Sequence, residues 1–232
     1  SYESHTGILF SADAFGAFGA LDGRIFNDED VVSESWYGEA RRYYANIVGK
    51  YGLQVQGALR KASAFDIKMI APLHGPVLSD DLAYYINKYN IWSSYAPEDD
   101  GVFIAYTSVY GNTKKAVLKL AEKLEAKGCK KVSVCDLARE DMAEAVEDAF
   151  RYSKTVFATT TYNADIFPFM REFINHLTER NFQNRTVAFI ENGSWAPLAA
   201  KVMRSMLEGA KNLTFTEKRI YFNYGQIERR FY

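Results

Sequence analysis

The chain has 232 residues, 48% of them hydrophobic, which is enough for a sizeable core in one domain or two. Its formal net charge of −1 argues against a nucleic-acid partner, because neutralising phosphates requires a basic excess or a basic stripe. No signal peptide or bilayer-spanning apolar run is visible, so we expect no membrane partner. Cys129 and Cys135 form no CxxC motif, and two reduced structural thiols are typical of a cytoplasmic protein.

The first half of the sequence predicts two short strands separated by helices. The strand-like runs are ILFSA at 8–12 and KMIA at 68–71. Between them, helical patterns extend from Ser35 to about Tyr51 and then through Leu59 and Ala62.

Two candidate metal ligands stand just past these strands. Asp13 follows the first strand, and His74 lies in PLHGP at 72–76 after the second. Such strand ends are where metal ligands gather in layered α/β hydrolase-like folds. From the residues alone a structural role stays open, since an aspartate there commonly caps a turn and a histidine between prolines can stack in one.

A domain boundary is predicted at residues 95–101. The segment YAPEDDG combines a proline, three acids and a glycine just before the next buried strand. We therefore expect one domain over residues 1–97 and a second over residues 98–232.

The second domain alternates strand and helix patterns at the spacing of a doubly wound parallel sheet. Strands are expected at 102–107, 132–136, 155–160, 186–191 and 214–222, with helices at 113–127, 140–152, 168–179 and 197–209. Five parallel strands that bind a ligand at their carboxyl ends, where the strand order reverses, form the flavodoxin arrangement.

The first of these strands leads into a predicted phosphate-binding loop. Residues 102–113, VFIAYTSVYGNT, are a buried strand that breaks into a hydroxyl- and glycine-rich turn and then opens a helix. A helix start offers unpaired N–H groups and a partial positive charge. The GxxxxGK[ST] motif of nucleotide-triphosphate loops is absent. The expected ligand contacts are Thr107, Ser108, Val109, Tyr110, Gly111, Asn112 and Thr113.

Two further loops are suited to a flat aromatic ring. They are Thr160, Thr161, Tyr162 and Asn163 after the third strand, and Asn192, Gly193, Ser194 and Trp195 after the fourth. Tyr162 and Trp195 are expected to sandwich an isoalloxazine, while backbone groups reach its polar edge. Each loop alone can be read as a capping or packing feature. Their position after successive strands favours a shared ligand site.

Four segments occur in an order that identifies a family: SADAFG at 11–16, PLHGP at 72–76, YGNT at 110–113 and TTYN at 160–163. Over nearly its whole length the chain resembles the flavodiiron proteins, or A-type flavoproteins. In these proteins a metallo-β-lactamase-like domain with two irons is fused to a flavodoxin-like FMN domain. The resemblance implies that residues 1–97 are the C-terminal part of the metallo-β-lactamase-like αββα domain and that residues 98–232 bind FMN.

The resemblance also implies roles and partners. Asp13 would bridge the two irons, His74 would be the last histidine ligand, and residues 107–113, 160–163 and 192–197 would hold FMN. The implied activity is reduction of dioxygen to water, of nitric oxide to nitrous oxide, or of both. A rubredoxin or a flavin reductase would donate electrons, and the chain would form a head-to-tail homodimer or a dimer of dimers.

Two departures from the family pattern bear on this function. The family's other iron ligands lie in an H-x-E-x-D-H motif and a further histidine, whereas this chain has three histidines and no such motif. The remaining ligands are therefore expected from a missing N-terminal part or from another chain. The loop NGSWAP is also less glycine-rich than in many relatives. Two alternatives stay open, an FMN electron-transfer flavoprotein without a working metal site and a zinc hydrolase on the same scaffold.

Overall fold

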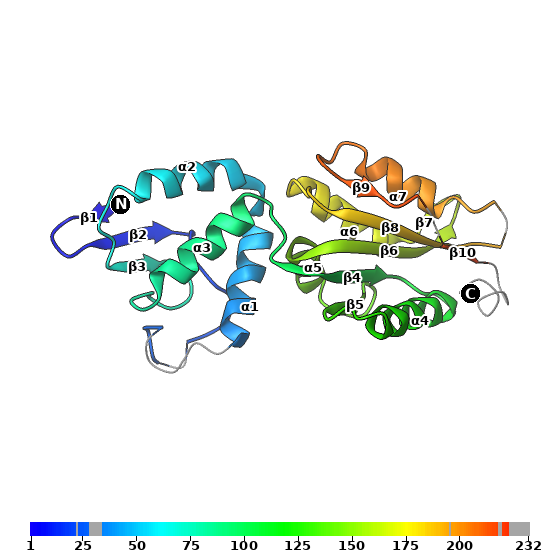
Figure 1. The fold of residues 1–232 in the computed structure, drawn as a ribbon, viewed down its shortest axis with the longest axis horizontal. Coiled ribbons are helices and arrows are strands. Elements are labelled where there is room, and N and C mark those ends of the chain that lie inside the picture. Colours follow the sequence, from blue (N-terminus) through cyan, green and yellow to red (C-terminus); the bar gives the residue numbers. More distant parts are fainter. Residues whose placement is uncertain (22, 28–33, 195, 218–219, 223–232) are drawn as a thin grey trace. The chain divides into compact units, whose positions relative to one another are not determined.

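A computed structural model describes residues 1–21, 23–27, 34–194, 196–217 and 220–222. The chain divides into two compact units, Ser1–Ala96 and Pro97–Tyr232 (Figure 1). No helix in these ranges has both the length and the apolarity needed to cross a bilayer.

The first unit is a small sheet with helices. β2 (Ile8–Ala12) pairs with β1 (Tyr2–Glu3) in antiparallel fashion and with β3 (Met69–Pro72) in parallel. The helices are α1 (Glu34–Tyr43), a π-helical turn (Tyr44–Val48), a 3-10 turn (Gly49–Tyr51), α2 (Gly52–Ala62) and α3 (Leu82–Ser93). The helical run expected from Ser35 is thus present, and its backbone hydrogen bonding changes from α-helical to π-helical at Tyr44.

One glycine explains how the end of this helical run packs. A Cβ atom on Gly52 would lie 2.5 Å from the Ser93 carbonyl oxygen and 2.7 Å from the Tyr95 ring. The Tyr95 hydroxyl donates to the Gly49 carbonyl at 2.8 Å and accepts from the Gly52 N–H at 3.2 Å. Only glycine therefore allows α2 to start this close to the end of α3.

The second unit is the predicted doubly wound sheet. Its strands are β4 (Asp99–Tyr106), β5 (Val132–Asp136), β6 (Tyr152–Tyr162), β8 (Thr186–Asn192) and β10 (Ile220–Phe222). Their order is β10-β8-β6-β4-β5 and every neighbouring pair is parallel, which confirms the flavodoxin-like strand order. The expected last strand appears as β9 (Thr214–Phe215) and β10, both paired with β8.

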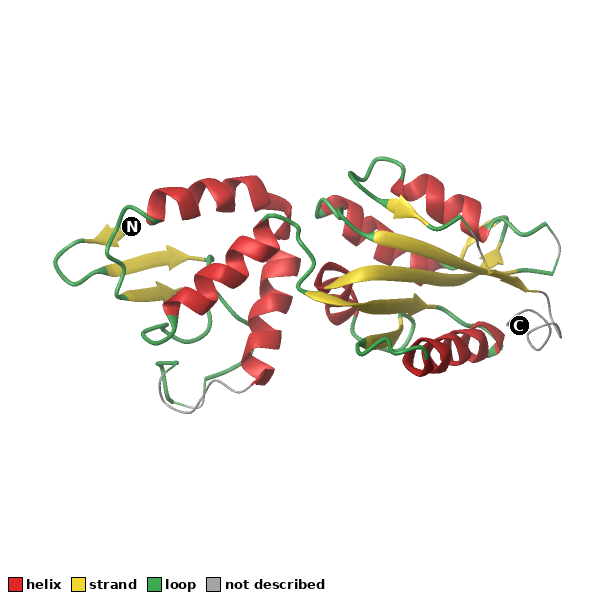
Figure 2. Cartoon of the chain, in the orientation of Figure 1, coloured by secondary structure: helices red, strands yellow, loops and turns green. Residues whose placement is uncertain are grey.

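Helices cover both faces of this sheet, as a parallel sheet requires (Figure 2). Strand residues such as Phe103 and Phe157 pack against α5 (Met142–Arg151), α6 (Pro168–Glu179) and α7 (Ala199–Leu207). Their neighbours Ile104 and Val156 point to the opposite face, where α4 (Asn112–Ala126) packs. Cys135 and Cys129 are free thiols, and burial raises the pKa of Cys135 to about 12, so its thiol stays protonated at neutral pH.

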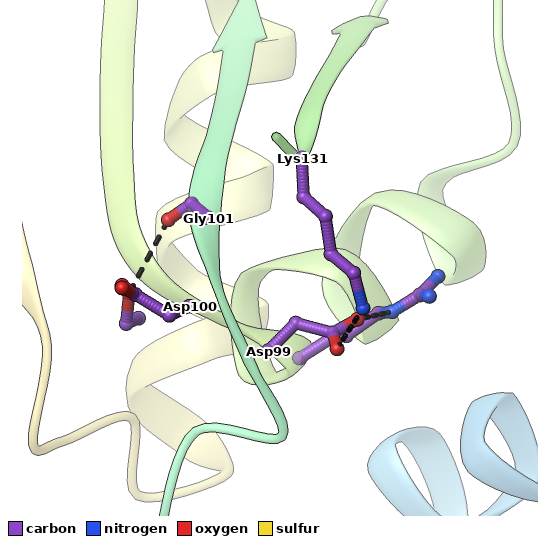
Figure 3. A network of polar contacts seen from close by, with 6 residues as sticks. Asp99, Asp100, Gly101 and Lys131 are labelled. Atoms are coloured by element: carbon purple, nitrogen blue, oxygen red, sulfur yellow. Dashed lines mark hydrogen bonds and ion pairs between the residues drawn. The ribbon is translucent and has the colours of Figure 1, made fainter. Parts of the chain in front are cut away.

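An ion-pair network fixes the amino end of β4 (Figure 3). The Asp99 carboxylate accepts hydrogen bonds from Lys131 Nζ and, at 2.7 Å, from Arg151 Nε. Asp100 turns to the other side of the strand, where Ser153 Oγ donates to it at 2.8 Å. Burial alone would raise the pKa of Asp99, but the hydrogen bonds from Lys131 and Arg151 outweigh burial and hold that pKa below its usual value.

We predict that Asp99→Asn lowers the free energy of unfolding at pH 7 by about 1–3 kcal/mol, because two charge-assisted hydrogen bonds are lost. A depressed carboxyl pKa stabilises the folded state above the unfolded-state pKa of about 4 and loses that effect as the pH falls through the folded-state value. Urea unfolding at pH 7 and at lower pH measures both effects. The difference between wild type and variant should shrink in acid.

The matched control is Asp100→Asn, because the Asp100 side chain is 87% exposed. That change should alter the unfolding free energy by less than about 0.5 kcal/mol. Equal losses in the two variants would contradict the structural role given to Asp99.

Candidate functional site

Three loops of the second unit meet at one edge of the sheet. β4, β6 and β8 are adjacent and parallel, with Tyr106 beside Ala158 and Thr160 beside Asn192. The loops that follow these strands therefore emerge side by side at the carboxyl edge (Figure 2). These are the three loops for which the sequence predicts the phosphate and ring contacts.

Two hydroxyls of the first loop already have structural partners. The buried Thr107 Oγ1 lies 2.6 Å from Thr159 Oγ1 on β6. Ser108 Oγ accepts the Lys114 N–H at 3.2 Å and so caps the first turn of α4. Both side chains shape the loop whether or not they also touch a ligand.

The backbone of the same loop offers free donors. Within the described part of the chain, nothing accepts a hydrogen bond from the N–H groups of residues 109–113. Gly111 has a φ of +84°, which an L side chain would strain, and it turns the chain into the 15-residue helix α4. These N–H groups and the positive end of the α4 dipole form a site that fits a phosphate.

The side chains around this site are accessible or link the loops. Tyr110 is 87% exposed and Val109 is 45% exposed. Thr113 is buried, and its hydroxyl accepts from Asn192 Nδ2 at 3.5 Å. The first and third loops are thus joined by the predicted residues Thr113 and Asn192.

The second loop is a tight β-hairpin. β6 continues past Thr160 and pairs with β7 (Asp165–Ile166) in antiparallel fashion. Asn163 and Ala164, with φ values of 52° and 57°, form a two-residue turn with both residues left-handed. Tyr162 is half exposed, and its ring meets Phe167 edge-on at 5.3 Å between centroids. The Tyr162 ring is therefore partly exposed, while the β6–β7 hairpin and Phe167 hold it in place.

The third loop is held by two threonines of β6. Thr160 Oγ1 donates to the Asn192 carbonyl at 3.1 Å. Thr161 Oγ1 accepts the N–H groups of Leu198 and Ala199 at 3.0 and 3.2 Å. Ser194 is exposed, and Trp195 lies outside the described residues, so its predicted ring contact remains a prediction.

In the first unit, Asp13 and His74 come together as their positions after parallel strands suggest. His74 Nε2 lies 3.8 Å from Asp13 Oδ1, and the two side chains are 57% and 62% exposed. The Ala17 N–H donates to the His74 carbonyl at 3.2 Å. Gly75, at a φ of +87°, has no room for a Cβ atom, which would lie 3.0 Å from the Ala17 nitrogen.

Tyr43 is a site residue that the sequence reasoning missed. Its hydroxyl donates to Asp13 Oδ1 at 3.5 Å, and its ring centroid lies 5.8 Å from that of His74. Burial, and then the Asp13 charge, raise the pKa of Tyr43 above its usual value. Asp13, Tyr43 and His74 line a pocket of about 740 Å³. Nothing in the helical pattern around Tyr43 distinguishes it from a core residue.

The donor set for a metal is incomplete within the described residues. They contain no group of three or more His, Cys, Asp or Glu side chains that could hold an ion. Asp13 and His74 therefore do not fit a two-iron centre by themselves. His176 lies elsewhere, on α6, 3.3 Å from Glu172.

Strand order and loop positions together define a doubly wound α/β domain with a candidate phosphate-binding loop at its carboxyl edge. A family model for the flavodoxin domain matches residues 103–228. The chain belongs to this flavodoxin-domain family.

Sequence relatives are named as anaerobic nitric oxide reductase flavorubredoxins. The anaerobic nitric oxide reductase flavorubredoxin of Klebsiella pneumoniae subsp. pneumoniae is 27% identical over 213 residues, which cover 90% of this chain and 44% of the relative. The flavorubredoxin of Aeromonas salmonicida is also 27% identical over 213 residues, or 90% of this chain and 40% of that protein. The chain thus spans less than half the length of these curated relatives.

Solved structures share the fold. Rubredoxin oxygen:oxidoreductase from Desulfovibrio gigas superposes with a TM-score of 0.84 and 22% identity, covering 98% of this chain and 57% of that one. The flavodiiron protein of Giardia intestinalis gives a TM-score of 0.82 and 24% identity, covering 98% and 56%. At this identity the likeness establishes the α/β fold with its parallel sheet.

We predict that Ala164→Gly raises the free energy of unfolding by about 0.5–1 kcal/mol, because a left-handed φ costs an L residue more than glycine loses in backbone entropy. Ala164→Val is the matched variant and should lower stability, since a β-branched side chain tolerates positive φ poorly. Thermal unfolding measures both. Shifts in the same direction would show that the turn is not left-handed at this position.

Proposed function

We propose that this chain is the FMN-binding part, with part of the metal site, of a cytoplasmic flavodiiron-type reductase. The substrate is dioxygen, reduced to water, or nitric oxide, reduced to nitrous oxide. The observation that carries the proposal is the meeting of three loops at one sheet edge, with unpaired N–H groups at the start of α4. The flavorubredoxin relatives, named as nitric oxide reductases, support the choice of reaction.

The residues of this edge would hold FMN in two ways. The N–H groups of residues 109–113 bind the phosphate, helped by Asn112 and Thr113. The Tyr162 ring and the loop at 192–197 flank the isoalloxazine, which is the group that accepts and passes on electrons when bound. An exposed aromatic on a rigid hairpin suits this role because little side-chain freedom is lost on binding.

The metal part of the proposal concerns the pocket around Asp13 and His74. Carboxylate and imidazole groups suit iron, but two of them cannot complete the site. We propose that they act together with ligands from a further part of the protein or from another chain. A rubredoxin or a flavin reductase would supply electrons, and a head-to-tail homodimer or dimer of dimers would bring flavin and metal together.

A second function is favoured by one observation. Because no third metal-binding side chain joins Asp13 and His74 in the described ranges, the chain also suits an FMN electron-transfer flavoprotein without a working metal site. Detecting bound metal would distinguish the gas reductase from the electron-transfer flavoprotein. Detecting bound flavin would not, because both would bind FMN.

The deciding measurement is the ratio of iron to FMN in the purified protein, by metal analysis beside the flavin absorption spectrum. Two irons per FMN would support the gas reductase, and flavin without iron would support the electron carrier. In the iron-containing protein, His74→Ala should abolish reduction of both gases and leave FMN bound, because a metal ligand is lost. Activity that survived this change would contradict the metal role of His74.

We also predict that the double change Asn112→Ala and Thr113→Ala weakens FMN binding at least about tenfold, because hydrogen bonds to a charged phosphate are lost. Titration of flavin-free protein with FMN gives the dissociation constant. The control is Lys119→Ala with Glu122→Ala, two exposed positions on the same helix. Unchanged FMN binding in the loop variant would overturn the phosphate assignment.

A further inference from the structure

The side chain of Thr161 binds the residues that follow the loop at 192–197 and lies beside Gly193 near the start of that loop. At the far end of the loop, Thr161 Oγ1 accepts the N–H groups of Leu198 and Ala199, at 3.0 and 3.2 Å. At the near end, a Cβ atom on Gly193 would lie 3.2 Å from the same oxygen and 3.4 Å from Thr161 Cβ. Gly193, Leu198 and Ala199 therefore all lie close to this one threonine.

These two hydrogen bonds cap the amino end of α7. Leu198 is the N-cap residue of α7 and Ala199 is its first residue, and the Leu198 side chain makes no capping hydrogen bond. Their N–H groups are among the first of the helix, which have no partner within it. Thr161 accepts these two N–H groups from a different strand, more than thirty residues earlier in the chain, and Glu191 Oε2 on β8 accepts the next one, from Ala200, at 3.0 Å.

The chemistry of a hydroxyl limits what else Thr161 can do. A threonine hydroxyl has two lone pairs and one proton, and two N–H donors occupy the lone pairs. Thr161 can therefore meet a ligand only as a donor, through its single proton. The sequence predicted Thr161 as one of the residues of a ring-binding loop, and this hydrogen bonding gives it a further structural part there.

The support on which Thr161 stands is rigid. Thr161 pairs with Ile166 in the hairpin of β6 and β7, and the neighbouring Thr160 pairs with Asn192 and donates to its carbonyl at 3.1 Å. Because the backbone of Thr161 is paired in the hairpin of β6 and β7, its side chain can set the shape of the neighbouring 192–197 loop. A preformed loop binds its ligand with less loss of conformational entropy.

We propose that Thr161 is a positioning residue that fixes the shape of the 192–197 loop before the flavin ring binds. It does so by accepting two hydrogen bonds just after the loop and by lying against Gly193 near its start. The inference rests on the FMN site proposed above and deepens it. In this arrangement a residue of β6 helps to set the shape of the ring loop.

The test compares Thr161→Val with Thr161→Ser in the full chain. Valine keeps the shape of threonine and removes the acceptor, so two N–H groups lose their partner; serine keeps the acceptor. We expect Thr161→Val to raise the FMN dissociation constant about three- to thirtyfold, a range set by the worth of a helix cap. The midpoint potentials of the bound flavin should shift as well, while Thr161→Ser stays near wild type in both measurements.

Controls separate positioning from general loss of structure. Thr178→Val removes a hydroxyl that donates to the Ile174 and Asn175 carbonyls within α6, and it should leave FMN affinity and potentials unchanged. Far-UV circular dichroism of each flavin-free variant checks that the sheet and helices remain. Gly193→Ala provides a second approach, because the new methyl group presses on the Thr161 hydroxyl. Combined with Thr161→Val, its effect on affinity should not be additive.

The outcomes are distinct. If wild type fails to bind FMN, the proposed function itself is wrong. If wild type binds FMN and Thr161→Val retains both affinity and potentials, the positioning role is overturned and the FMN site stands. An equal loss in the valine and serine variants would also overturn it, because the methyl group and not the hydroxyl would then matter.

Discussion

The parallel alignment of β4, β6 and β8 is the constraint on which the candidate site depends. Each of these strands runs in the same direction and is paired with its neighbour, with unbroken register from Val102 to Tyr106 of β4 and throughout the pairing of β6 with β8. Their following loops must then share one edge, although they are far apart in sequence. The buried hydroxyl pair of Thr107 and Thr159 fastens the first two strands at that edge. Helices on both faces bury the apolar side chains of these strands and exclude water from them.

The two edges of this sheet differ in their electrostatics. At the amino edge, Asp99 is neutralised by Lys131 and Arg151. The carboxyl edge contributes hydroxyls and backbone N–H groups instead, and Asp136 at the end of β5 is paired with Arg139 at 2.9 Å. An anion bound at the start of α4 therefore meets the helix dipole and free donors, with this neighbouring carboxylate already neutralised.

Local sequence patterns predicted the secondary structure of the second unit well. The helix at 168–179 was placed at its true bounds because Pro168 suits a first helical turn and Phe173, Ile174 and Leu177 follow at helical spacing. The first unit was harder. α3 was not predicted, because its buried side chains are largely tyrosines, which a polarity pattern does not distinguish from surface residues. The change from α- to π-helix at Tyr44 likewise left no local signal.

The positions of the candidate loops could be predicted from the sequence, whereas the hydrogen-bond partners of their side chains could not. The loops were identified because each follows a recognisable strand. The roles of individual side chains depend on partners distant in sequence, such as Asp13 for Tyr43 and Leu198 for Thr161. Ser108, a predicted ligand contact, also accepts the Lys114 N–H of its own helix, a partner that the local sequence pattern did not reveal.

The two candidate sites differ in how much of their chemistry lies within this chain. The predicted phosphate and ring contacts all belong to loops of the second unit. Asp13 and His74 are held by the backbone contact of Ala17 and by Tyr43, yet both remain more than half exposed. A metal centre normally surrounds its ligands with further protein groups that orient them. Flavin binding and metal binding should therefore be separable properties of this chain, with the flavin bound whether or not the metal site is complete.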